Sequence, residues 1–324
     1  MRLLLTGDRP ARNARKAPPA VAENTIVTEA DARLAGLYLS AAQQAWKGAV
    51  GGPPEDGSPL AVNLAEEHRY ATDRLSTPMS QAWTYAETVG LVAHDHLVQL
   101  QESLLSFSNG QGTCPKSSVQ TMTRVAMESL STQRWLIDPS IDTWERYKRW
   151  ICLETISTRH EWAMLHDGED HARNPELKAL YEDADANQLR RHPRGEWIGV
   201  EEPKATDQAS LLLSRFDTYA PHLLAADDAA SLGTLLYRLL SGAVHGSTGH
   251  VLSSLVGIGE TTEDGLPVVS YRLTTGILWQ CVIAALIAKF TAGCEYAAWV
   301  GKPVPAEAVR LMRAHYGSLT DRMV

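Results

Sequence analysis

Residues 117–137 read SSVQTMTRVAMESLSTQRWLI, and this stretch decides the fold class. Its apolar residues recur near helical spacing, at Val119, Met122, Val125, Ala126, Leu130 and Ile137. Such spacing gathers side chains on one face of an α-helix. Similar patterns predict further helices over residues 28–46, 62–75, 80–108, 141–166, 175–191, 206–219, 227–245, 273–300 and 305–317. We therefore expect an all-α fold, a multi-helix bundle.

Strand signals are confined to one short segment. Residues 266–273, LPVVSYRL, are the only stretch with a strand-like pattern. One short strand cannot make a sheet. The sequence therefore predicts at most a small hairpin or extended excursion near residues 258–273.

The beginning of the chain differs from the remainder. Residues 1–27 carry five basic side chains and three prolines and show neither helical nor strand periodicity, which predicts a disordered basic tail. Thr28 and Asp31 have the spacing of a capping box at a helix start. We expect residues 28–324 to form a single helical domain, with the loop at 192–205 as the best candidate for an internal division.

Composition and missing motifs narrow the function. The net charge of -8 argues against a surface that is basic throughout, although it leaves room for a local basic groove. The apolar run 277–288 is shorter than a bilayer span and ends at Lys289, so we expect no membrane association and a cytoplasmic location. Phosphate-loop, dinucleotide, nucleophile-elbow and zincin motifs are missing, so no cofactor is expected.

A metal site in the bundle is one functional alternative. Asp167 and His171 would lie on one face if their segment were helical. With His166, and with His94 and His96 from another helix, they would supply ligands for a helical-bundle metalloenzyme.

Residues 237–247, YRLLSGAVHGS, hold a second candidate site. Arg238, Ser241 and His245 fall on one helical face. A guanidinium can hold phosphate oxygens, and a neutral imidazole can take a proton from a hydroxyl nucleophile. A purely structural alternative is equally concrete, because the same helix could pack tightly while Arg238 pairs with Glu128.

Two stretches, residues 117–150 and 235–247, together resemble an uncharacterised actinobacterial family of all-helical proteins. The matching residues are Arg124, Glu128, Trp135, Leu136, Ile137, Asp138, Pro139, Arg146, Tyr237, Ser241, His245 and Gly246. That family in turn resembles the HEPN superfamily, helical bundles that are usually dimers and in many cases metal-independent ribonucleases with an Arg-x4–6-His motif. Here six residues separate Arg238 from His245.

The resemblance implies a phosphate-handling protein, either a metal-independent ribonuclease or a nucleotide-binding module. His245 and Arg238 would be catalytic, Arg124 and Arg146 would add positive charge, and Glu128, Tyr237 and Ser241 would complete the surroundings. The implied partners are RNA or a nucleotide and a second copy of the chain, as a homodimer. Since many HEPN-like proteins lack catalysis, a non-catalytic, antitoxin-like regulatory protein that binds a protein partner is the alternative.

Overall fold

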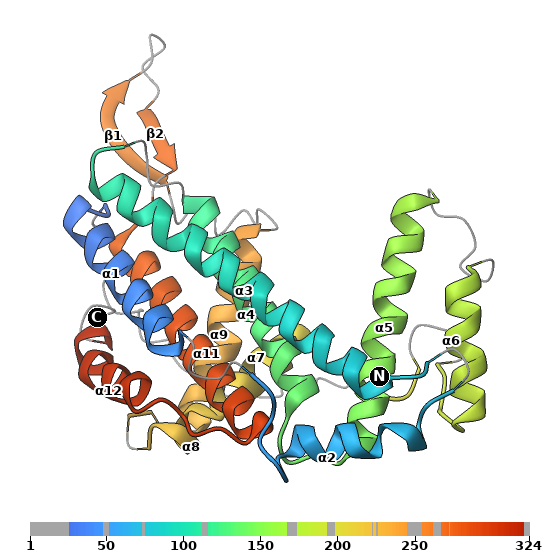
Figure 1. Cartoon of the computed structure of the whole chain (residues 1–324). Helices are drawn as coiled ribbons and strands as arrows, with labels where there is room; N and C mark the ends of the chain where they lie inside the picture. The colour runs from blue at the N-terminus through green and yellow to red at the C-terminus, as the bar shows by residue number, and fades with distance from the viewer. Residues whose placement is uncertain are drawn as a thin grey trace, which may run out of the picture.

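The chain folds into a helical bundle with one small hairpin (Figure 1). The computed structural model describes residues 26–47, 52–72, 75–111, 116–166, 174–192, 198–221, 223–224, 226–244, 255–261, 267–271 and 273–320. The elements are α1 (Glu29–Trp46), α2 (Pro59–Glu66), the 3₁₀-helix η1 (Glu67–Arg69), α3 (Pro78–Ser108), α4 (Lys116–Ile137), α5 (Thr143–Leu165), α6 (Pro175–Ala186), α7 (Ala205–Ser214), α8 (Phe216–Tyr219), α9 (Ala226–Val244), β1 (Leu255–Thr261), β2 (Pro267–Tyr271), α11 (Thr275–Val300) and α12 (Ala306–Thr320). The predicted all-α bundle is confirmed.

The hairpin lies close to its predicted position. Strand β1 pairs antiparallel with β2, with Leu255 opposite Tyr271, and the register shifts between Gly257 and Thr261. Figure 1 shows the two strands projecting from one end of the bundle. The rest of the described chain buries its core between helices.

Local capping chemistry sets several helix ends. The Asp31 amide donates to Thr28 Oγ1 at 3.1 Å, and the Thr28 amide donates to Asp31 Oδ2 at 3.2 Å, so the predicted capping box is present. Helix α6 ends at Ala186, before the predicted residue 191, and Gln188 has a left-handed φ of 54° that interrupts the helix. The helix expected over 206–219 is divided into α7 and α8 at Arg215.

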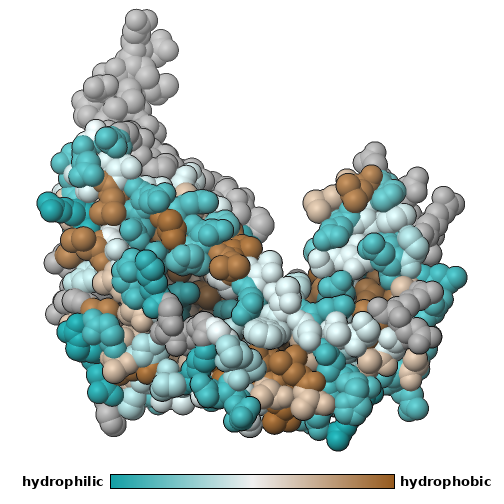
Figure 2. All heavy atoms as spheres, in the orientation of Figure 1, coloured by the Kyte–Doolittle hydropathy of each residue, from teal (hydrophilic) through white to brown (hydrophobic). Residues whose placement is uncertain are grey.

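Two hydrophobic clusters share the same three long helices. The larger cluster joins α1, α7, α8, α9 and α12 to α3, α4 and α11. The smaller cluster joins α2, α5 and α6 to other parts of those three helices. Figure 1 shows α5 and α6 standing apart from the main bundle, and Figure 2 shows a saddle in the surface between the two. The long helices therefore connect both parts of the molecule.

Helix α11 is the central helix. By length and composition it is long and apolar enough to cross a membrane, contrary to the sequence-based expectation for residues 277–288. However, 78% of its most apolar window is buried inside the protein, which is the pattern of a core helix. It contributes Trp279 to the larger cluster and Trp299 to the smaller one.

Two predicted segments lie partly outside the described residues. These are residues 1–25 of the predicted tail and residues 193–197 of the candidate division at 192–205. Ile26 and Val27, expected in the tail, are part of the fold: Val27 is buried and its amide donates to Leu273 O at 3.2 Å.

The close approach of α7 to α9 gives a stability prediction. A Cβ on Gly233 would lie 2.7 Å from Ala209 O and 3.0 Å from Ser210 Cα, both on the backbone of α7. We expect Gly233→Ala to lower the free energy of unfolding by about 1–3 kcal/mol, since backbone atoms cannot move aside cheaply. Gly276→Ala is the matched control, because nothing lies within 4 Å of its Cβ. Urea unfolding should show that control unchanged or slightly stabilised; equal midpoints for the two variants would contradict the packing.

Candidate functional site

Three side chains from α4 and α9 form a closed hydrogen-bonded group, the α4–α9 cluster of Arg124, Glu128 and Tyr237. Arg124 Nε donates to Glu128 Oε1 at 2.9 Å, and the Tyr237 hydroxyl donates to the same oxygen at 2.7 Å. The Arg124 guanidinium also lies over the Tyr237 ring, 5.5 Å from its centroid. The structure thus brings together three of the residues singled out in the sequence.

Electrostatics fix the protonation states of this cluster. Burial opposes the charge on Arg124, but the hydrogen bond and the charge of Glu128 outweigh it and raise the arginine pKa. Burial, followed by the hydrogen bond to Glu128, raises the pKa of Tyr237. At neutral pH the cluster therefore holds an arginine cation and a neutral phenol.

Arg238 faces away from this cluster. Successive residues of an α-helix point about 100° apart, so a Tyr237 side chain that contacts α4 turns Arg238 outward. Arg238 is exposed and Ser241, one turn on, is part-buried. The sequence-based pairing of Arg238 with Glu128 is absent from the contacts of the described residues, because Glu128 is held by Arg124 and Tyr237. His245 lies outside the described residues.

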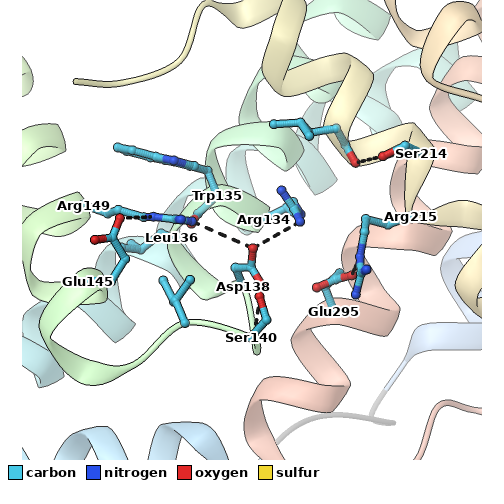
Figure 3. Close-up of polar contacts among 12 residues, drawn as sticks. Arg134, Trp135, Leu136, Asp138, Ser140, Glu145, Arg149, Ser214, Arg215 and Glu295 are labelled. Atoms are coloured by element: carbon cyan, nitrogen blue, oxygen red, sulfur yellow. Dashed lines mark hydrogen bonds and ion pairs between the residues drawn. The ribbon is translucent and has the colours of Figure 1, made fainter. Parts of the chain in front are cut away.

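A second polar group, the arginine junction, lies where α4, α5, α7 and α11 meet (Figure 3). It consists of two charged sets, Arg134, Arg149 and Asp138 in one and Arg215 and Glu295 in the other. Arg134 Nη2 lies 3.2 Å and Arg149 Nη1 4.0 Å from Asp138 Oδ2, while Arg215 Nε lies 2.9 Å from Glu295 Oε1.

Most of the arginine junction is inaccessible to water. The Glu295 side chain is 0% exposed, whereas that of its partner Arg215 is 37% exposed. Burial pushes the pKa of Asp138 up, but hydrogen bonds from Ser140 and the charges of Arg134 and Arg149 leave it lowered. Two buried atoms, Arg134 Nε and Glu295 Oε2, have no hydrogen-bond partner among the described residues. The junction is thus chiefly a buried charge network whose edge reaches solvent at Arg215.

Arg146 is a buried structural residue beside the arginine junction. The prediction that it adds positive charge near Arg238 is wrong. Arg146 is 1% exposed and its guanidinium donates to the carbonyl oxygens of Leu136 and Asp138 and, at 2.6 Å, to Asn63 Oδ1. Burial, together with the charge of Arg149, lowers its pKa to about 9. With its donors taken by neutral oxygens, Arg146 holds the turn after α4 in place.

The metal-site residues remain dispersed where they are described. Within the described ranges no group of three or more histidine, cysteine or acidic residues could hold a metal ion. His166 stacks on Trp162, with ring centroids 3.6 Å apart. His94 and His96 both lie on α3, while Asp167 and His171 lie outside the described residues.

Comparison of the chain with protein-family models, with curated proteins and with solved structures finds no match.

Sequence reasoning missed most of the arginine junction. Arg134, Arg149, Arg215 and Glu295 carry no motif, and their meeting depends on the packing of helices far apart in the chain. One signal was available: Glu295 is the one acidic residue in the predominantly apolar α11. Such a residue must be paired inside the protein.

Acid titration tests the role of Asp138. Because its pKa is lowered in the folded state, its ionisation stabilises the protein fully above the unfolded pKa of about 3.9, and this contribution disappears as the pH falls through the lower folded value. We expect Asp138→Asn to lower the free energy of unfolding by about 1–3 kcal/mol at neutral pH. The difference from the parent should shrink below pH 4 in chemical unfolding.

Glu307→Gln serves as the control, since its ion pair with Arg310 is on the surface of α12. It should leave the unfolding midpoint unchanged. A difference between Asp138→Asn and the parent that stays constant from neutral pH to pH 2 would contradict the assignment.

Proposed function

We propose that the chain is a phosphate-handling helical protein that binds RNA or a nucleotide at the outer face of α9, without a metal ion. The observation that supports this most is the α4–α9 cluster, which locks α9 against α4 through Arg124, Glu128 and Tyr237. That contact fixes the rotation of α9 and leaves Arg238 exposed at the next position. A guanidinium held on a rigid helix, with no acceptor among the described residues, is suited to a phosphate.

The HEPN-like resemblance extends this proposal to ribonuclease chemistry. His245 would remove the proton of a ribose 2′-hydroxyl, whose oxygen attacks the adjacent phosphorus, and the 5′-oxygen would leave with a proton. Arg238 would stabilise the negative charge that grows on the phosphoryl oxygens. The products would be a 2′,3′-cyclic phosphate and a free 5′-hydroxyl.

The test uses a fluorescein-labelled single-stranded RNA in EDTA, followed by anisotropy for binding and by denaturing gels for cleavage. We expect binding that weakens with salt, and Arg238→Ala should reduce the slope of log affinity against log salt by about 0.7, the value for one phosphate contact. His245→Ala should abolish cleavage while retaining binding. If the parent protein binds the RNA without cleaving it, the proposed binding is supported and the proposed catalysis is contradicted.

Arg313→Ala is the matched control, because Arg313 is an exposed arginine on a different helix, α12. It removes the same charge and should leave both the slope and cleavage unchanged. Absence of RNA and nucleotide binding at low salt, or equal slopes for the two arginine variants, would contradict the proposal.

A second function, homodimeric association without catalysis, is favoured by exposed leucines on α9 and on its neighbour α7. Leu235 on α9 is 62% exposed and Leu211 on α7 is 45% exposed. Leu235 and Arg238 are three residues apart, so they lie on neighbouring parts of one helical face. We propose that a second copy of the chain packs on Leu235 and leaves Arg238 accessible beside the seam, as the resemblance to dimeric HEPN proteins implies.

Sedimentation velocity tests the association. Leu235→Gln should shift the protein from dimer toward monomer, because it removes apolar area from the seam at similar side-chain length. Leu37→Gln on α1 is the control, since Leu37 is 51% exposed and lies on another helix. A monomeric parent, or equal dimerisation of the two variants, would contradict the proposed dimer.

A further inference from the structure

Two hollows meet at Lys289, on the side of α11 that faces α1 and α3. The first, the α3–α11 pocket, has a volume of about 360 Å³ and includes Leu91, Leu130 and Tyr296 in its lining. The second, the α1 hollow, has a volume of about 370 Å³ and is lined by Gln43, Gln44, Trp46, Lys47, His94 and Lys289. Trp46, His94 and Lys289 line both hollows. Each volume lies in the lower part of the range for small-molecule sites.

Lys289 has no counter-ion within the described part of the chain. It projects from the apolar helix α11, and no hydrogen bond or ion pair joins its Nζ to a described residue. Burial lowers its pKa, and no neighbouring carboxylate acts to restore it. An ammonium group in such surroundings gains most from an acceptor that enters the hollow.

The α1 hollow has a basic lining. The side chains that line this hollow include two lysines and a histidine but no acidic residue. Burial, followed by the charge of Lys289, lowers the pKa of His94, against the opposing charge of Asp95. Together these groups favour a ligand oxygen anion.

The adjoining pocket supplies apolar walls for the body of such a ligand. A Cβ on Gly293 would lie 2.6 Å from the Trp46 ring, so only glycine lets the indole lie against α11, one turn from Lys289. Leu91 and Leu130 add aliphatic surface. At this pocket Glu87 accepts a hydrogen bond from the Tyr296 hydroxyl at 2.8 Å, and its negative charge disfavours a second anionic group there.

We propose that the two hollows form one binding site for a small monocarboxylate with a flat apolar body. The carboxylate lies in the α1 hollow against Lys289, and the body lies in the α3–α11 pocket against Trp46. A carboxylate fits better than a phosphate because the lining has no arginine and no helix N-terminus, the groups that usually hold a phosphate. The site is separate from the α9 face and independent of the function proposed for it.

Isothermal titration with naphthalene-2-carboxylate and its neutral analogue naphthalene-2-carboxamide tests the site on the unmodified protein. We expect the carboxylate to bind about tenfold or more tightly than the carboxamide, because only the anion pairs with Lys289. Inorganic phosphate at the same concentration should not displace it. Equal affinities for the two naphthalene compounds, no binding of the carboxylate at millimolar concentration, or displacement by phosphate would overturn the proposal.

Lys289→Met tests the lysine itself, with Lys178→Met as the control. Methionine keeps a similar chain length without the charge, so the fold should be kept and the unfolding temperature should not fall. Lys178 is an exposed lysine on α6. We expect Lys289→Met to lose at least about tenfold in affinity for the carboxylate and to keep its affinity for the carboxamide, with no change in Lys178→Met. Unchanged carboxylate affinity in Lys289→Met would overturn the assignment.

Discussion

The burial of α11 on all sides is the constraint on which the rest of the structure depends. The helix contributes to both hydrophobic clusters, so a charged side chain on it is stabilised by a partner inside the protein or by a bordering cavity. Glu295 meets Arg215 at 2.9 Å, whereas Lys289 borders the α3–α11 pocket. The two charges are six positions apart, which places them about 120° apart around the helix. One core helix thereby gives rise to polar features on two different sides.

The turn between α4 and α5 shows how a sequence signature can be structural. Asp138 accepts hydrogen bonds from the amide and the hydroxyl of Ser140, and Arg149 lies over the ring of Trp135. Arg146 donates to the main-chain oxygens of Leu136 and Asp138. These contacts anchor α5 to the end of α4. The Trp-Leu-x-Asp-Pro part of the resemblance is therefore explained by the geometry of a turn without assigning it chemistry.

Periodicity was enough to predict the helices, because the apolar stripe of a helix is a local property of the chain. The same periodicity places Arg124 one helical turn from Glu128, but the sequence-based alternative paired Glu128 with Arg238 instead. Periodicity could not give the rotation of α9 against α4, which depends on packing and decides that Tyr237 rather than Arg238 reaches Glu128. Arg146 was misplaced for a related reason. Its acceptors are mainly backbone carbonyl oxygens, and the sequence does not reveal which carbonyl oxygens lack a partner in the helices.

The net charge of -8 does not decide whether an anion binds at the site proposed on α9. Charges more than about 8–10 Å away are largely screened at physiological salt, so the nearest groups dominate. Arg124 is already neutralised by Glu128, which leaves Arg238 as the uncompensated charge among the described residues of the α4–α9 contact. A single guanidinium holds a phosphate weakly, and a two-fold seam along α9 would place two of them near one strand. On this argument, association through Leu235 and phosphate binding through Arg238 support each other, because the first supplies the charge that the second needs.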